Sequence, residues 1–106
     1  MKEEGIQPTH CARMLRALAE PERLRIVQCL RDGPGNVSEL ARRLGSEIVN
    51  VSHHLGVLRQ AGLVIDEKQG RFVVYQLHPD VFHAEKNGDA PQHLDLGCCR
   101  LEIPSD

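Results

Sequence analysis

Residues 48–64 read IVNVSHHLGVLRQAGLV, and this stretch decides the fold. At about 100° per residue, four apolar side chains share one narrow stripe of a helix: Ile48, Val51, Leu55 and Leu58. The opposite face carries Val49, His53 and Gln60 and has no charge. Asn, Ser and His side chains both donate and accept hydrogen bonds, which is the chemistry needed to read DNA base edges. The stretch therefore predicts a helix with one face in a core and the other on DNA.

Length and composition set the broad class of the protein. A chain of 106 residues predicts one small domain. We expect a cytoplasmic protein with no membrane partner, because no apolar run approaches about 18 residues and the acidic start Met1-Lys2-Glu3-Glu4 is unlike a signal peptide. The aromatic side chains are few, which argues against base stacking on single strands.

The charge is unevenly divided along the chain. Residues 1–75 hold 11 Lys and Arg against 9 Asp and Glu, whereas residues 76–106 hold 2 against 6. The net charge of -2 therefore comes from the tail. A near-neutral body is compatible with DNA binding, because phosphate contacts depend on where the cations stand.

Two helices are predicted ahead of the opening stretch. Thr9 can cap the first, and Pro21 ends it and suits the first turn of a second helix over 22–30. The side chains expected to point inward are Cys11, Met14, Leu15 and Leu18 in the first helix and Leu24, Ile26, Val27 and Leu30 in the second. Residues 31–35, RDGPG, predict the end of the second helix.

A short third helix completes a helix-turn-helix. Asn36 followed by Glu39 predicts a capping box, and Gly45 is placed to end the helix. Leu40, Ala41 and Leu44 are expected to be buried. Two helices joined by a tight glycine-containing turn, the second with a neutral polar face, are typical of this DNA-binding motif.

A β-hairpin is predicted directly after the DNA-contacting helix. Gly62 ends that helix, and Gln69-Gly70 separates the runs 63–65 and 71–77, which are rich in β-branched and aromatic residues. A hairpin in this place is a wing, with Lys68 and Arg71 near its tip to meet phosphate or the minor groove. The fold class is therefore mainly α with a small β-hairpin, a winged helix-turn-helix.

The tail lacks this periodicity. Pro and Gly residues interrupt it so often that we expect an irregular segment over 79–106, with at most one or two helical turns between Asp80 and Lys86. The predicted organisation is a DNA-binding domain over 1–78 followed by a tail that carries a vicinal cysteine pair.

Three blocks of the sequence resemble a known family. They are LAEPERLRI at 18–26, VSHHL with LRQAGLV at 51–64, and GRFVVY at 70–75. In this order and spacing they are similar to the ArsR/SmtB family of metal-responsive bacterial repressors, over about residues 9–77. The resemblance implies a winged-helix homodimer that represses transcription until an inducer, usually a metal ion or metalloid, releases it from DNA.

Three departures from the family pattern stand out. The Cys-x-Cys that arsenic sensors carry in the third helix is absent from VSELARR at 37–43. The tail is too broken for the long C-terminal helix whose carboxylate and His pairs bind zinc-type ions. Ile48 and Val49 stand where the family commonly has polar residues.

The predicted DNA-binding residues are Val49, Asn50, Ser52, His53, His54, Lys68 and Arg71. His53 lies at the centre of the exposed face. Val49 either contacts a thymine methyl group or is an ordinary surface valine. For His54, which lies nearer the buried stripe, a structural hydrogen bond competes with a phosphate contact. Adjacent helical residues diverge by about 100°, so His53 and His54 make a poor metal site together.

The predicted metal ligands are Cys11, Cys98 and Cys99. A disulfide framework is not expected in a cytosolic chain, and Cys29 is interpreted as a small core residue. The vicinal pair is Cys98 and Cys99. Core packing gives no reason for two adjacent cysteines here, and as thiolates they would chelate a soft ion. Trigonal or tetrahedral coordination needs a third donor, for which Cys11 of the same or the partner protomer is the first candidate and His93 and His10 are the reserves.

These patterns predict a homodimeric repressor that binds double-stranded operator DNA with an inverted repeat. Its inducer would be a thiophilic ion such as arsenite, antimonite, cadmium, lead or zinc. One alternative is a redox sensor in which the same thiols oxidise. An alternative of another class is a small thiol-dependent metal-handling or arsenate-reducing protein. An enzyme is not expected, because no Cys-x-x-Cys or nucleophile-base pair is visible.

Overall fold

The computed structural model describes residues 8–84 and 92–103. Its helices are α1 (Pro8–Leu18), α2 (Pro21–Arg31), α3 (Val37–Leu44) and α4 (Ile48–Gln60). Its strands are β1 (Gly35–Asn36), β2 (Val64–Gln69), β3 (Phe72–Leu77), β4 (Phe82–His83), β5 (His93–Asp95) and β6 (Arg100–Glu102). Four helices with small antiparallel sheets confirm the predicted winged helix-turn-helix.

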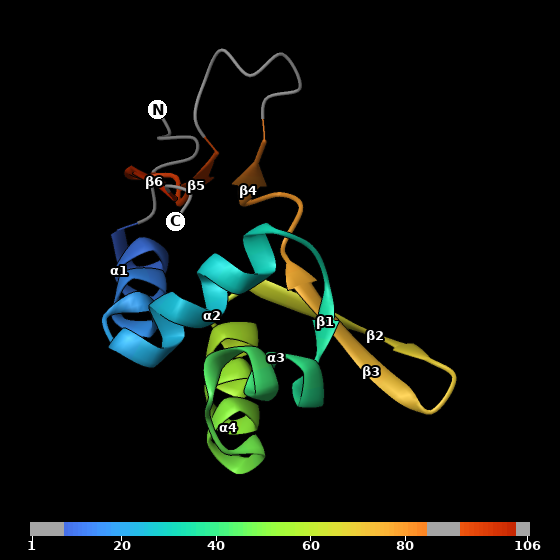
Figure 1. Ribbon diagram of the computed structural model, residues 1–106. Coiled ribbons are helices and arrows are strands. Elements are labelled where there is room, and N and C mark those ends of the chain that lie inside the picture. The colour runs from blue at the N-terminus through green and yellow to red at the C-terminus, as the bar shows by residue number, and fades with distance from the viewer. Residues whose placement is uncertain (1–7, 85–91, 104–106) are drawn as a thin grey trace.

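The strands form two antiparallel sheets (Figure 1). In the first, with order β1-β3-β2, the wing strands pair from Val64 with Leu77 to Gln69 with Phe72. In the second, with order β4-β5-β6, the strands come from the tail. Figure 1 places α4 between α1 on one side and the wing on the other, with the tail sheet at the opposite end of the molecule from α4.

Local signals set the ends of the helices. Pro21 stands in the first turn of α2, and the Glu20 carboxylate accepts a hydrogen bond from the backbone N–H of Arg23. The α3 capping box is confirmed, because Asn36 and Glu39 each accept a hydrogen bond from the other's backbone N–H. The prediction that Thr9 caps α1 was wrong, since the helix already begins at Pro8, whose fixed φ suits a first turn.

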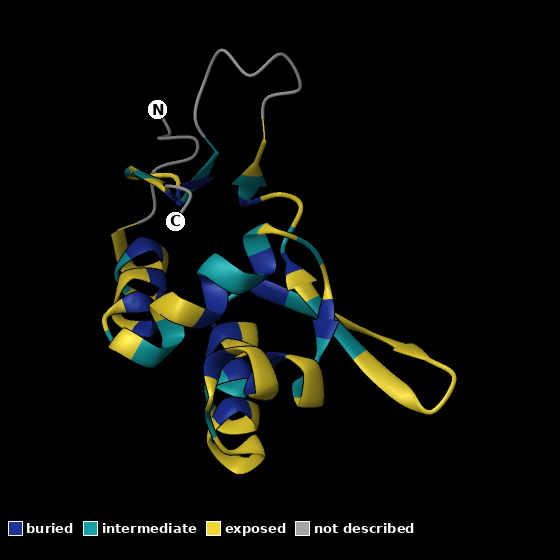
Figure 2. Cartoon of the chain, viewed as in Figure 1, coloured by how far each residue is buried: buried dark blue, intermediate teal, exposed yellow. Residues whose placement is uncertain are grey.

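Three side chains predicted to point inward are exposed. Leu15 is 39% exposed, Leu24 is 47% exposed and Ile48 is 54% exposed. In α1 and α2 the buried stripe is narrower than the apolar one, so Leu15 and Leu24 lie at its edge. Ile48 is the first residue of α4, at the end of the helix that projects from the body (Figure 2).

The tail is more regular than predicted. Instead of an irregular segment, its described part forms β4, β5 and β6. Residues 79–81 form a turn that leads into β4, so no helix begins at Asp80, and Lys86 lies outside the described residues. The strand β1, which pairs with Val74 and Tyr75 of β3, was also missed, because two residues are too few for a period.

One hydrophobic cluster joins the helices and the tail. Ile26, Leu40, Leu55 and Leu63 are fully buried at its centre. The tail contributes Val81, Leu94, Leu96 and Ile103 to the same cluster. The tail sheet is therefore packed on the core that holds the helix-turn-helix. Among the described helices, none is long and apolar enough to cross a membrane.

Candidate functional site

The face of α4 that is predicted to contact DNA bases, which we call the reading face, is exposed. Val51, Leu55 and Leu58 are fully buried and fix the rotation of the helix against the body. This rotation turns four predicted DNA-binding residues outward: Val49, Asn50, Ser52 and His53. Val49 is 76% exposed, and it shares its face with His53 one turn later. The outer face of α4 is therefore free to enter a groove.

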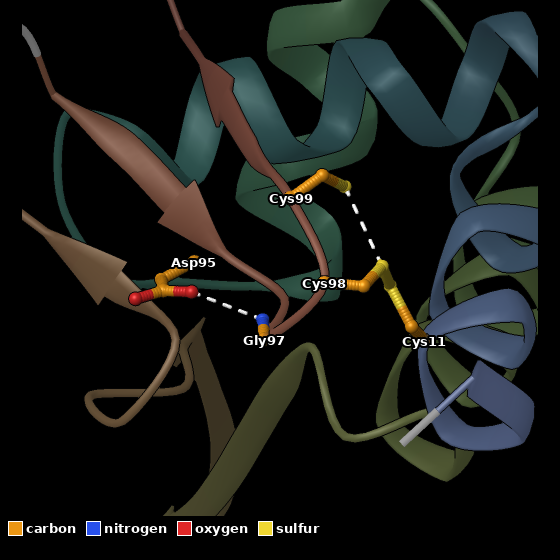
Figure 3. The surroundings of a disulfide bond; sticks show 5 residues. All are labelled: Cys11, Asp95, Gly97, Cys98 and Cys99. Carbon is orange, nitrogen blue, oxygen red and sulfur yellow. Dashed lines mark hydrogen bonds between the residues drawn. A yellow bond between two sulfur atoms is a disulfide. The ribbon is translucent and has the colours of Figure 1, made fainter. Parts of the chain in front are cut away.

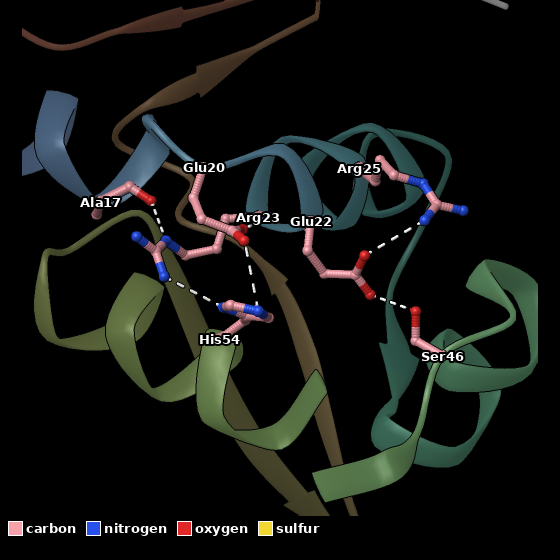
Figure 4. Close-up of polar contacts among 7 residues, drawn as sticks. All are labelled: Ala17, Glu20, Glu22, Arg23, Arg25, Ser46 and His54. Carbon is pink, nitrogen blue, oxygen red and sulfur yellow. Dashed lines mark hydrogen bonds and ion pairs between the residues drawn. The ribbon is translucent and has the colours of Figure 1, made fainter. Parts of the chain in front are cut away.

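His54 differs from its neighbours, because it is half-buried and has partners within the chain (Figure 4). The Arg23 guanidinium lies with Nη1 3.1 Å from His54 Nδ1, and Glu20 Oε1 lies 3.9 Å from Nε2. Arg23 also donates from Nε to the carbonyl oxygen of Ala17 at the end of α1. Of the two roles left open for His54, these contacts favour the structural one.

A second set of contacts fixes the turn before α4. The Ser46 hydroxyl donates to the Glu22 carboxylate (Figure 4). Arg25 Nη2 donates to the carbonyl oxygen of Leu44 at 2.9 Å. Gly45 adopts φ of 68°, which allows the chain to leave α3 in the left-handed conformation. The position of α4 is therefore set from α2 at both Ser46 and His54.

The wing presents its cations at the tip. Gly70 has φ of 64° and closes the hairpin between Gln69 and Phe72, as predicted from sequence. Lys68 and Arg71 are exposed on either side of this turn. Phe72 is 53% exposed beside them. The tip is thus an exposed projection that carries two cations.

The three predicted metal ligands lie together (Figure 3). Cys11 is buried on α1, while Cys98 and Cys99 lie in the turn between β5 and β6. All three sulfur atoms lie within 4.8 Å of one another. Gly97 supports the turn by donating its backbone N–H to Asp95 Oδ1 at 3.0 Å. We call Cys11, Cys98 and Cys99 the thiol cluster.

A disulfide joins two members of the thiol cluster, which the sequence did not lead us to expect. It links Cys11 to Cys98, whose Cα atoms are 6.1 Å apart, a normal separation for such a bond. Cys99 is a free thiol with its sulfur 3.8 Å from that of Cys98. This bond joins α1 to the tail turn.

The reserve ligands and Cys29 lie elsewhere. The ring of His93 stacks on that of His83, with centroids 5.3 Å apart, because the two residues face each other across β4 and β5. Among the described residues, neither His93 nor His10 belongs to the group that could hold a metal ion. Cys29 is half-buried on α2 and packs against the core, as interpreted from the sequence.

Sequence reasoning missed Glu20 and Arg23 as supports of α4. Charged residues on the polar face of a helix are usually solvated, so Arg23 gave no distinct signal. Glu20 had one, since an acidic residue directly before Pro21 is well placed to cap α2.

Comparison with known proteins identifies the family. Residues 10–67 match a family model described as a helix-turn-helix domain. The chain is 45% identical over 89 residues to the HTH-type transcriptional regulator NmtR of Mycobacterium tuberculosis, covering 81% of this chain and 73% of NmtR. It is 48% identical over 66 residues to CmtR of the same species, covering 62% of this chain and 56% of CmtR.

A solved structure with the same fold is the homodimeric winged helix-turn-helix DNA-binding domain of Mb0332 from Mycobacterium bovis. It is 29% identical, with a TM-score of 0.66, over 69% of this chain and 68% of that one. The exposed face of α4, the wing and these relatives together show that the chain belongs to the ArsR/SmtB family of winged helix-turn-helix transcriptional regulators.

Proposed function

We propose that this protein is a cytoplasmic homodimeric repressor that leaves its operator when a thiophilic ion binds the thiol cluster. The observation that carries the proposal is that three sulfurs from two distant parts of the chain lie within 4.8 Å of one another. The DNA-binding part rests on the exposed residues of α4 and on Lys68 and Arg71 of the wing. Base contacts come from Asn50, Ser52, His53 and Val49, and phosphate contacts from the wing.

The dimer is needed because one recognition helix reads only half of a site. Two copies related by a twofold axis bind an inverted repeat, with half-sites about one helical turn apart. On this chain, Leu15 of α1 is 39% exposed and offers apolar surface for a second copy. The Mb0332 domain, which has the same fold, is homodimeric. A monomer in sedimentation at micromolar concentration, with DNA binding intact, would contradict this assembly.

The reduced thiol cluster suits a soft ion. Three thiolates satisfy a trivalent metalloid such as arsenite or antimonite, and they also suit cadmium, lead or zinc. Two sulfur ligands of a tetrahedral ion at about 2.3 Å are about 3.8 Å apart. The sulfurs of Cys98 and Cys99 have this separation, 3.8 Å. Binding requires the Cys11–Cys98 disulfide to be reduced, because a disulfide sulfur is not a thiolate ligand.

Release from DNA follows from where the thiol cluster lies. An ion would tie the start of α1 to the tail turn, and the end of α1 contacts α4 through Arg23 and His54. If the ion binds better to a dimer whose two α4 helices are wrongly spaced for DNA, it lowers operator affinity by that preference. A coupling of about 1 to 3 kcal/mol is enough to regulate a promoter.

The test is operator binding in reducing buffer, with and without a panel of soft ions. The double variant Cys98→Ser/Cys99→Ser should bind DNA as the wild type does but should no longer be released. Cys29→Ser is the matched control, because Cys29 is a free cysteine outside the thiol cluster, and its release should be unchanged. Release that persists in the double variant overturns the site. Full ion affinity in Cys11→Ser would leave the vicinal pair in place and move the third ligand elsewhere.

A second function is favoured by the disulfide itself. In this alternative the repressor senses redox state, and oxidation of Cys11 and Cys98 by a peroxide or a low-molecular-weight disulfide changes DNA affinity. The discriminating measurement compares oxidised and dithiol-reduced protein on operator DNA without any metal. If oxidation alone releases the protein and ions under reducing conditions do not, redox sensing replaces ion sensing.

A further inference from the structure

The recognition helix carries too few cations to hold DNA by itself. The only Lys or Arg among the 13 residues of α4 is Arg59, in the last turn. Phosphate contacts by Lys and Arg supply a large share of DNA affinity. The wing provides Lys68 and Arg71, but Figure 1 shows the wing on one side of α4 only. Cations on the other side of α4 have to come from another element.

A cavity of about 460 Å³ lies on that other side, between α1 and α4. Its lining residues are Arg13, Arg16, Ala17, Arg23, Val57, Gln60 and Ala61. Three of these residues are arginines, and no Asp or Glu among the described residues lines the cavity. Such a cavity fits an oxyanion, and phosphate is the oxyanion that guanidinium binds with well-matched geometry.

The wall formed by α4 continues its reading face. Val57 and Gln60 follow His53 by four and seven residues, so they lie on the same side of the helix. Gln60 is about 10 Å further along the helix axis than His53. A recognition helix contacts bases with its N-terminal residues in a groove about 12 Å wide. Its C-terminal half therefore leaves the groove beside the sugar-phosphate backbone, where this cavity lies.

The three arginine side chains differ in whether other residues hold them in place. Arg23 is half-buried and held by the Ala17 carbonyl and His54, so its position is fixed. Arg13 and Arg16 are exposed and neighbour each other on α1, because they are three residues apart. The nearest acid in this network, Glu20, contacts the Arg23 backbone and His54, not the two exposed guanidiniums. Arg13 and Arg16 are therefore available to an incoming phosphate.

The proposed dimer contact on α1 leaves these side chains open. Leu15, the exposed apolar residue of α1, lies about 160° around the helix from Arg13 and about 100° from Arg16. A partner copy that covers Leu15 thus uses a different flank of α1.

We propose that Arg13 and Arg16 bind the phosphate backbone of operator DNA on the side of α4 opposite the wing. Arg23 lines the same site and contributes its positive charge from a fixed position. This inference rests on the proposed DNA-binding function and adds α1 to the elements that contact DNA. With it, the duplex is held by cations on both sides of the reading face.

The test is the salt dependence of DNA binding by the full chain. The variants Arg13→Gln and Arg16→Gln each remove one charge, and Arg100→Gln is the matched control, an exposed arginine on β6 at the far end of the molecule from α4. Affinities are measured by fluorescence anisotropy at several salt concentrations, for the operator and for a scrambled duplex. Inorganic phosphate binding and sedimentation are measured on the same samples.

Each of the two α1 variants should reduce the slope of log K against log salt by about 0.9, equally for both duplexes. The loss of affinity between 50 and 200 mM salt should then be about threefold smaller than for the wild type, a factor given by that change in slope. Arg100→Gln should keep the wild-type slope. These results, with an unchanged dimer in sedimentation, support the proposal.

Several results would overturn it. Wild-type slopes in Arg13→Gln and Arg16→Gln would remove α1 from the interface while leaving the proposed repressor intact. Weaker binding of inorganic phosphate with unchanged DNA binding would make the cavity a site for a free anion. A loss fully explained by dissociation of the dimer would assign the arginines to assembly. A wild-type chain that binds neither duplex would reject the proposed function itself.

Discussion

The helix-turn-helix and the C-terminal sheet differ in how much of their structure neighbouring residues determine. In α3 and α4, the capping box of α3, the turn glycines and a helical period act within a few residues of each other. In the tail, strands of two or three residues depend on cross-strand pairs such as Phe82 with Leu94 and Leu94 with Leu101. The reading face is thus built from local sequence, and the thiol cluster from contacts between distant segments.

The two regions nevertheless share one core. Leu94 of the tail is 2% exposed and Leu55 of α4 is fully buried, and both belong to the same hydrophobic cluster. An ion at the thiol cluster would therefore act on an element that is already packed against the DNA-binding body. This arrangement is what a sensor requires if its two sites are to share conformational states.

The largest expected effect tests whether the tail is part of that core. Leu55→Ala and Leu94→Ala remove the same atoms from two fully packed positions, so each should lower the free energy of unfolding by about 2 to 5 kcal/mol. Denaturant unfolding at one fixed protein concentration measures both. If Leu94→Ala leaves the unfolding midpoint unchanged, the tail sheet folds independently of the helices and the shared core is wrong.

The next effect separates the two kinds of DNA contact. His53→Ala and Asn50→Ala should each cost about 1 to 3 kcal/mol of operator affinity and relax base preference, because they remove base-edge hydrogen bonds. Arg71→Ala should instead weaken binding to every sequence and flatten the salt dependence. Competition binding on a set of single-base operator variants distinguishes them. An Arg71→Ala protein with the wild-type salt slope on nonspecific DNA would refute the wing assignment.

A smaller effect concerns His54, which belongs by sequence to the reading helix and by contact to α2. His54→Ala removes the partner of a half-buried guanidinium, so we expect a loss of about 1 to 2 kcal/mol in stability with base preference retained. Thermal unfolding and operator selectivity are the two readouts. Relaxed selectivity with unchanged stability would return His54 to the DNA contacts.

The sequence was most informative where the signal was local. Asn36 and Glu39 predicted the cap of α3, and Gly70 predicted the turn of the wing, because each feature is decided within four residues. Side-chain direction was predicted less well. Ile48 has the spacing of a core residue but lies at the projecting end of α4, and sequence does not reveal where a helix leaves the body.

The thiol cluster was predicted from thiol chemistry together with the arrangement that the family resemblance implies. Adjacent cysteines pointed to a ligand pair. The resemblance placed the first helix beside the C-terminal segment and so pointed to Cys11 as the third donor, and the structure brings its sulfur to within 4.8 Å of that pair. The disulfide partner could not be chosen, since 87 residues separate Cys11 from Cys98 and no periodic pattern spans the tail turn. Arg13 and Arg16 gave no signal either, because exposed arginines on a helix are common.

The smallest expected effect tests the local side of the comparison. Asn36→Ala removes the side-chain oxygen that accepts the Glu39 backbone N–H at 2.8 Å, and the cost should be about 1 kcal/mol in stability. Asn36→Ser is the matched control, because a hydroxyl can make the same cap and should restore the lost stability. Well below the unfolding temperature both variants remain folded, and α3 still positions the turn into α4. Operator affinity measured there should therefore stay near wild type in both variants. If serine is as destabilising as alanine, the cap is not what holds the start of α3. The pairing of Asn36 with Val74 in the β1–β3 ladder would then be the better explanation, and the start of α3 would depend on a distant strand in the way that the tail does.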